Sequence, residues 1–371
     1  MNTIIENLNG AGERLLRVGW PVLWQSSRLM IIVFCLDFLL AKEIRAAGRY
    51  ALWLVVLAKL LLPPTLALST GAAWWLIPAK EVAPQPVLKQ YSVSYGETLP
   101  PADFEVSSVP LPPPPPPRLE RTGWLLLTAS TVSAMLLLWM TVRWWQVARM
   151  VWKAKPVETD SGALAAAQTF AKWRSPVRLK MVEGRMSPAV CGLFRPVILL
   201  PRELAEKLSS EQLRAVLLHE LFHLRRGDVW VNCARALIQI VYWWHPLLWL
   251  ANARIRRLRE EAVDDAVMLA LRDEADGYAP ALLAVAKLAF RRPLLSLGLV
   301  GIMESRSALR QRIERLVDFR APRKAGLTFA SLLAICAFSA VALPMGEAPQ
   351  SEPKTIDAMA KPLMLLASQS I

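Results

Sequence analysis

The chain has 371 residues, of which 54% are hydrophobic and 20% charged, and its mean hydropathy is +0.32. This composition, with 15 tryptophans, indicates a membrane protein rather than a water-soluble one. The formal net charge of +14 could suit a nucleic-acid partner, but anionic lipid headgroups beside a membrane-tethered domain explain it more simply. We therefore expect contact with membrane lipid and no direct nucleic-acid binding.

The N-terminal segment 1–77 contains two apolar stretches, at residues 21–41 and 51–68. Both contain charged residues, and the second contains the break Pro63-Pro64. Interfacial or re-entrant segments are the alternative, but charged side chains are tolerated inside a span when they face protein or water. We expect two transmembrane helices here.

Residues 78–122 form a proline-rich segment with an unbroken proline run at 112–117, which is typical of a stiff polyproline II spacer. A contact site for an external partner or cell-wall material is the alternative. The stretches 123–142 and 325–343 contain no charged residue, and either can cross a hydrocarbon core about 30 Å thick. They are the third and fourth predicted transmembrane helices.

The intervening region 143–324 has the pattern of an α+β domain. Helical spacing continues past the third span to about residue 155 and recurs at 163–173. Short β-patterns follow at 177–182 and 197–200. An exposed edge strand can line a cleft and pair with an extended peptide, and we expect the strand at 197–200 to do so.

The strongest motif is His-Glu-Leu-Phe-His at 219–223, which uses two of the three histidines of the chain. Histidines at i and i+4 project from one helical face, so His219 and His223 can hold one metal ion. Glu220 beside that face can act as general base for the attacking water. Ser209 and Gln212 offer a capping box before this helix, and Gly227 is a plausible stop. The absence of a Cys-x-x-Cys motif disfavours a thiolate zinc site.

A catalytic zinc needs a third protein ligand and an open position. His245 is the only other histidine, but it precedes a proline in a tryptophan-rich stretch that suits packing or a membrane interface. The alternative is a carboxylate from the two Glu–Asp pairs at i, i+4, Glu260 with Asp264 or Glu261 with Asp265. In either pair the Glu can ligate while the Asp supports a ligating histidine.

Charge predicts the topology. The loop 42–49 has a net charge of +2, whereas the segment 78–122 and the tail 344–371 are each net −1, and most of the positive charge lies in 143–324. Short basic loops remain in the cytoplasm. We therefore expect both termini, the proline-rich loop and the short tail outside, and the metal-binding domain in the cytoplasm.

Three sequence blocks resemble the BlaR/MecR-type membrane zinc metallopeptidases, the antirepressor family that includes beta-lactam sensor-transducers. The blocks are residues 187–201, residues 219–228 followed by Asn232, and His245-Pro246 with residues 260–265. The family has a cysteine before the aspartate of the third block, where this chain has Val263. A later segment around Arg312 also resembles one in which a basic residue faces the cleft.

The resemblance implies a fold class and a site. The fold is a polytopic α-helical bacterial inner-membrane protein with four spans and a cytoplasmic α+β, gluzincin-like domain. One Zn²⁺ per chain is implied, held by His219, His223 and Glu260, with Asp264 supporting a ligating histidine. Glu261 with Asp265 remains the alternative register.

The family also implies a signal-transducing endopeptidase that cuts a cytoplasmic winged-helix repressor or itself. The C-terminal penicillin-binding sensor domain of the beta-lactam receptors has no counterpart in residues 344–371, so we expect no direct beta-lactam sensing. A constitutive quality-control protease and a non-catalytic regulator with structural zinc are the alternatives. The sequence leaves the oligomeric state open.

Overall fold

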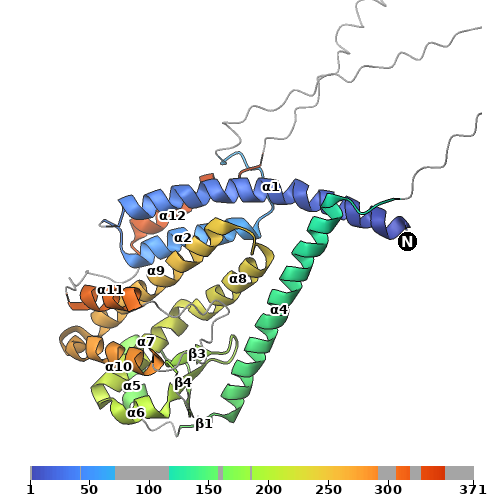
Figure 1. Ribbon diagram of the computed structural model, residues 1–371. Coiled ribbons are helices and arrows are strands. Elements are labelled where there is room, and N and C mark those ends of the chain that lie inside the picture. Colours follow the sequence, from blue (N-terminus) through green and yellow to red (C-terminus); the bar gives the residue numbers. More distant parts are fainter. Residues whose placement is uncertain are drawn as a thin grey trace, which may run out of the picture.

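The computed structural model describes residues 2–41, 43–71, 117–157, 162–183, 186–290, 306–317 and 327–346. Most of the predicted proline-rich segment and of the C-terminal tail lies outside these residues. The described chain is mainly helical, with one small sheet at the end of the molecule opposite the first helix (Figure 1).

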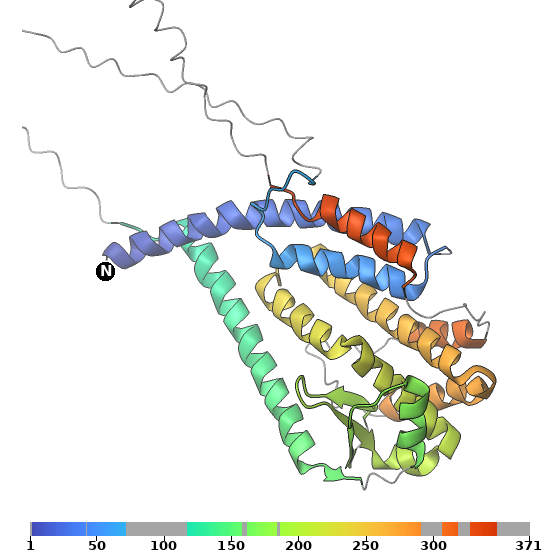
Figure 2. The same cartoon turned by 180° about the vertical axis from the view of Figure 1, so that it is seen from behind.

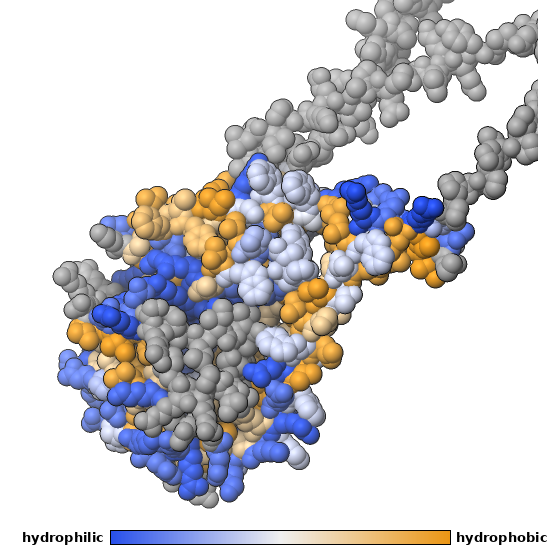
Figure 3. All heavy atoms as spheres, viewed as in Figure 1, coloured by the Kyte–Doolittle hydropathy of each residue, from blue (hydrophilic) through white to orange (hydrophobic). Residues whose placement is uncertain are grey.

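Four apolar helices lie at the top and along one side of the molecule (Figures 1 and 2). They are α1 (Asn2–Leu39), α2 (Ala46–Leu61), α4 (Arg121–Lys153) and α12 (Phe329–Ala342). Helices α2 and α12 run beside α1, whereas α4 leads away from α1 toward the sheet. Figure 3 shows hydrophobic side chains gathered over the end that holds α12 and along much of α4, with hydrophilic ones at the sheet end.

Two of these helices, α1 and α4, are long and apolar enough to cross a membrane. Only Gly123 and Met140 are buried in α4, so most of its apolar surface contacts no protein among the described residues. Helix α12 has 14 residues and is about 21 Å long, shorter than the hydrocarbon core. The structure therefore supports a membrane-associated chain, and the four-span topology stays a prediction.

The N-terminal helices differ from the predicted boundaries. Helix α1 begins at Asn2 and continues through Pro21, so it is longer than the predicted span 21–41. Helix α2 ends at Leu61 before the proline pair, and most of its residues are buried. The last part of the predicted N-terminal segment, from residue 72 onward, lies outside the described residues.

The sheet has the strand order β1-β2-β4-β3. Its strands are β1 (Lys155–Pro156), β2 (Arg178–Val182), β3 (Ala189–Cys191) and β4 (Val197–Pro201). Strand β4 pairs in parallel with β2 and antiparallel with β3. The prediction that the strand at 197–200 is the edge strand is therefore wrong, because β4 is fully buried between two neighbours. The short strand β3 forms that edge instead.

The remaining helices lie between β1 and β2 or after β4 in the chain. They are α5 (Gly162–Ala171), α6 (Arg202–Lys207), α7 (Ser210–Arg226), α8 (Asp228–Val241), α9 (Pro246–Leu271), α10 (Tyr278–Phe290) and α11 (Arg306–Val317), with a short 3-10 helix, η1 (Arg272–Gly277), before α10. The predicted start of α7 is confirmed. Ser209 accepts from the Gln212 amide, the Gln212 side chain accepts from the Ser209 amide, and Gly227 ends the helix with φ 71°.

Two hydrophobic cores hold the molecule together. The sheet core packs α5, α7, α9 and α10 against β2 and β4, around residues such as Ile198, Leu217 and Leu221. The second, which we name the apolar-helix core, joins α1 and α2 to α8 and α9 through residues such as Trp53 and Leu248. The predicted boundary at residue 143 therefore does not separate two packing units, because side chains from both sides of it share this second core.

A buried carboxylate reinforces that junction. Asp37 of α1 accepts from Arg49 of α2 at 2.5 Å and from Arg254 of α9 at 2.5 Å, and the Trp53 indole also donates to it at 3.2 Å. Because an unpaired buried charge is strongly destabilising, this arrangement holds three helices in a fixed relation.

Candidate metal centre

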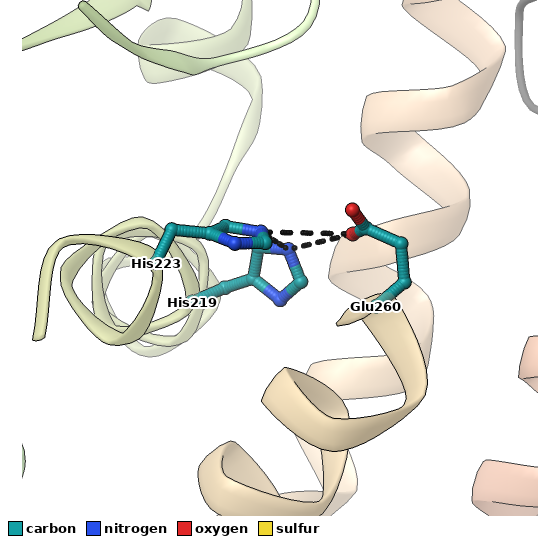
Figure 4. Close-up of side chains that lie close together, drawn as sticks. All are labelled: His219, His223 and Glu260. Atoms are coloured by element: carbon teal, nitrogen blue, oxygen red, sulfur yellow. Dashed lines mark hydrogen bonds and ion pairs between the residues drawn. The ribbon is translucent and has the colours of Figure 1, made fainter. Parts of the chain in front are cut away.

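The two motif histidines project from one turn of α7 toward a carboxylate of α9 (Figure 4). The Nε2 atoms of His219 and His223 lie 3.2 Å apart. The Oε2 atom of Glu260 lies 3.5 Å from Nε2 of His219 and 3.6 Å from Nε2 of His223. Tetrahedral zinc with bonds of about 2.0–2.2 Å separates its ligand atoms by about 3.4 Å. The three atoms therefore form a triangle of the size that one such ion requires.

Hydrogen bonds on the far side of each ring set the direction of its lone pair. The Tyr278 hydroxyl donates to Asp264 Oδ1 at 2.6 Å, so it accepts from Nδ1 of His219 at 2.8 Å. Nδ1 of His223 donates to Asp228 Oδ2 at 2.8 Å. With a metal ion bound, each ring would carry a single proton, on Nδ1, which leaves its Nε2 lone pair free to bind the ion. This donor set fits a metal cation.

Glu260 is oriented by the residue before it. Arg259 donates to Oε1 of Glu260 from Nε at 3.1 Å and from Nη2 at 2.7 Å, which leaves Oε2 to face the histidines. Its neighbour Glu261 instead accepts from Arg257 at 2.8 Å and lies near Arg315 at 3.8 Å. The geometry therefore favours Glu260 over Glu261 as the third ligand.

The electrostatics also favour a cation at this point. Burial opposes ionisation of Glu260, but the charges of Arg259 and His223 hold the pKa of Glu260 well below its usual range. Burial lowers the pKa of His223, but the charge of Glu260 and the hydrogen bond to Asp228 outweigh it and raise that pKa to about 9. The anionic carboxylates thus create a negative potential between the rings.

Asp264 supports His219 indirectly. Its Oδ1 lies 3.6 Å from Nδ1 of His219, with the Tyr278 hydroxyl bridging the two. Arg312 of α11 donates to both Asp264 oxygens, at 2.8 and 2.9 Å, and its Nη1 lies 3.7 Å from Glu260. Burial opposes the charged form, but Arg312 keeps the pKa of Asp264 below its ordinary value. Arg312 is 8% exposed and lies against these carboxylates.

Two candidate residues, Glu220 and His245, are not part of the triangle of ligand atoms. Glu220 directly follows His219 in α7, and its side chain is buried. Cys191 lies in the edge strand β3, and burial, with the charge of Glu220 as a second cause, raises its pKa to about 12. His245 lies elsewhere: it is fully buried, and its Nε2 is 2.9 Å from the Ser26 hydroxyl of α1.

Sequence reasoning gave no role to Asp228, Tyr278 or Arg259. A local signal existed for Asp228, since a carboxylate just after the glycine that ends a helix can turn back onto that helix. Tyr278 is 59 residues from His219 and carries no sequence signal for its role.

The fold and this site define a membrane-associated metallopeptidase. A family model described as "BlaR1 peptidase M56" matches residues 21–316, which is most of the chain. The chain belongs to this family, which confirms the resemblance drawn from the three sequence blocks.

Two relatives show similarity over shorter segments. The chain is 38% identical over 85 residues to the "Regulatory protein BlaR1" of Bacillus licheniformis, covering 23% of this chain and 14% of the relative. It is 26% identical over 82 residues to the "Methicillin resistance mecR1 protein" of Staphylococcus aureus, covering 22% and 14%. The aligned segments therefore span about one seventh of the length of these relatives.

Proposed function

We propose that this chain is a membrane zinc endopeptidase in which His219, His223 and Glu260 hold one zinc ion and Glu220 acts as general base. The convergence of the three ligand atoms, with Glu220 on the same turn of α7, carries this proposal. A structural zinc site has no need of a glutamate at that position, so the arrangement favours an enzyme over a non-catalytic regulator.

Zinc, when bound, polarises the scissile carbonyl and lowers the pKa of water. Glu220 takes the proton of the attacking water and then donates it to the leaving amine nitrogen. Arg259 and Arg312 hold Glu260 and Asp264 in their charged forms, so the ligand set keeps its geometry as protons move.

Strand β3 is the place where an extended substrate could pair. It bonds to β4 on one side, and among the described residues no strand pairs with its other side. A peptide added to this edge would gain main-chain hydrogen bonds. Strand β3 packs against α7, the helix that contains Glu220, so such a peptide would lie near the general base.

Metal content and cleavage, measured on the same variants, test the mechanism. We expect purified full-length protein to hold one zinc per chain by elemental analysis. His219→Ala and His223→Ala should lose the metal, whereas Glu220→Gln should keep it and lose proteolysis. Full proteolytic activity in Glu220→Gln would contradict the assignment of the base.

We further propose four spans with both termini outside and the zinc domain in the cytoplasm. The basic loop 42–49 supports this orientation. Reporter fusions after Arg118 and Pro344 should report an external location, and fusions after Lys155 and Asp276 a cytoplasmic one. An external report at Asp276 would replace the cytoplasmic substrate with an envelope one.

The proposed substrate is a cytoplasmic winged-helix repressor, or a segment of this chain itself, cut in response to an envelope signal. The relative from Bacillus licheniformis is named a regulatory protein, which supports a regulatory role. Proteins cut in cells that carry the native chain but not Glu220→Ala would identify the substrate. One repressor in that set supports this proposal, whereas many unrelated membrane proteins would indicate quality control.

A further inference from the structure

A tyrosine of the apolar helix α2 reaches the metal centre. The Tyr50 hydroxyl donates to Asp228 Oδ1 at 3.2 Å, and Asp228 Oδ2 accepts from Nδ1 of His223 at 2.8 Å. Tyr50 is 6% exposed and Asp228 3% exposed, so water does not readily replace either bond. The hydroxyl from α2 is thus two hydrogen bonds away from a proposed zinc ligand.

Tyr50 fixes how the Asp228 carboxylate is turned. One oxygen serves His223, and the other faces Tyr50, with Nε of Arg226 at 3.7 Å. The Arg226 guanidinium also lies over the Tyr50 ring, 4.9 Å from its centroid. Without the hydroxyl, the side-chain contact left to Oδ1 among the described residues would be the longer one to Arg226, and the carboxylate could rotate away from the imidazole. The orientation of His223 therefore depends on Tyr50.

The position of Tyr50 is itself set by ion pairs to Asp37. The adjacent Arg49 pairs with Asp37 of α1, and Arg254 of α9 pairs with the same carboxylate. These buried ion pairs hold the N-terminal turn of α2 against two other helices. The hydroxyl thus reaches Asp228 from a frame built by α1, α2 and α9.

We propose that Tyr50 is a positioning residue for the metal centre: through Asp228 it holds the His223 ring so that Nε2 faces the zinc ion. Helix α2 of the apolar N-terminal region thereby contributes to the metal affinity of the peptidase domain. This inference rests on the proposed zinc site. It predicts that a displacement of α2 relative to α8 weakens zinc binding without any change in the ligands.

The test compares Tyr50, whose hydroxyl donates from α2, with Tyr242, whose hydroxyl donates to a carbonyl oxygen of α2. Tyr50→Phe removes the hydroxyl that holds Asp228, whereas Tyr242→Phe removes a hydroxyl that donates to the Leu60 carbonyl oxygen at 3.2 Å, away from the metal. Zinc dissociation constants are measured on full-length protein in detergent by chelator competition. The visible spectrum of the Co²⁺-substituted protein reports ligand geometry.

Loss of an outer hydrogen-bond partner typically costs about 10–100-fold in metal affinity. We expect Tyr50→Phe to weaken zinc binding about 10-fold and to alter the Co²⁺ spectrum, and Tyr242→Phe to leave both unchanged. Equal affinities and spectra in Tyr50→Phe and the native chain would overturn the inference. A native chain that binds no zinc would overturn the proposed function instead.

A double-mutant cycle provides a second test that does not depend on the stability of either variant alone. If Tyr50 acts through Asp228, adding Tyr50→Phe to Asp228→Asn should weaken zinc binding no further. Additive losses would show that Tyr50 does not act through Asp228 and would contradict the proposal.

Discussion

The two histidines of one helical turn are held by two different regions of the molecule. His219 is supported through Tyr278, Asp264 and Arg312, from α9, α10 and α11 beside the sheet core. His223 is supported through Asp228 and Tyr50, from α8 and α2 beside the apolar-helix core. The metal centre therefore lies where the two cores meet. A movement of one core against the other would move the residues that hold His219 relative to those that hold His223.

The support of His219 is the more rigid of the two. Asp264 receives two hydrogen bonds from a buried guanidinium and one from a buried phenol. Asp228 receives a single phenol bond at 3.2 Å and a longer contact from Arg226. Charge-assisted bidentate bonds are stronger and more directional than a neutral donor. The contacts therefore predict that His219 is held from the sheet-core side, whereas the support of His223 includes the apolar helix α2.

The largest effect is expected from the ligand that α9 contributes. Glu260→Ala should abolish stoichiometric zinc binding, because a ligand is lost and two buried arginine contacts lose their acceptor. Glu261→Ala is the matched control and should keep the metal, since its carboxylate lies toward Arg257 and Arg315. Elemental analysis of both variants measures their zinc content and so decides which glutamate is the ligand. Zinc loss only in Glu261→Ala would move the ligand by one residue and the supporting role to Asp265.

The two supporting aspartates should separate affinity from stability. Asp264→Asn and Asp228→Asn should each weaken zinc binding about 10–100-fold, because His223 loses its charged acceptor and His219 loses the carboxylate that holds its acceptor Tyr278. Asp264→Asn should also lower the free energy of unfolding by up to about 3–5 kcal/mol, since Arg312 loses its bidentate partner. Asp228→Asn should lower it less. Chelator competition and thermal unfolding measure the two effects.

A neighbouring pair provides the control for that comparison. Asp265 lies on the same turn of α9 as Asp264, but it pairs with Arg315 of α11 and contacts neither histidine. Asp265→Asn should change stability without changing zinc affinity. If it weakens zinc binding as much as Asp264→Asn does, then charge near α9, and not the bond to Tyr278, sets the affinity.

Tyr278→Phe should have a smaller effect on the metal. It removes the hydroxyl that joins His219 to Asp264, but Asp264 Oδ1 is only 3.6 Å from the ring nitrogen and can move to accept from it. We expect a loss of zinc affinity of about 10-fold or less. Combining Tyr278→Phe with Asp264→Asn should add little, and additive losses would argue against this hydrogen-bond chain.

His245→Ala should leave the metal unaffected. The ring is fully buried and faces Ser26 of α1, in the apolar-helix region away from the site. Its removal should lower the free energy of unfolding by roughly 1–3 kcal/mol, because a buried hydroxyl loses a partner. Zinc content and thermal unfolding are the measurements. Metal loss from a folded variant would make His245 a ligand and overturn the proposed triad.

Helix α7 shows what sequence can predict well. Its start at a capping box, its stop at Gly227 and the shared face of His219 and His223 all follow from residues within one or two turns. The strands β2 and β4 also lie close to their predicted positions. The order of those strands in the sheet was not predictable. Strand β4 pairs with β2 although β3 lies between them in the sequence, and no local pattern indicates such a pairing.

The sequence by itself determined the metal-binding helix, the carboxylate pairs on α9 and the family, because each depends on spacing along a single segment. Only the tertiary structure decided that Glu260 and not Glu261 faces the rings, and that Arg312 lies on Asp264. It also brought Tyr50 to Asp228, a contact between residues 178 positions apart. Such contacts arise from the packing of whole helices, and no local periodicity encodes which side chains meet when two cores close on one another.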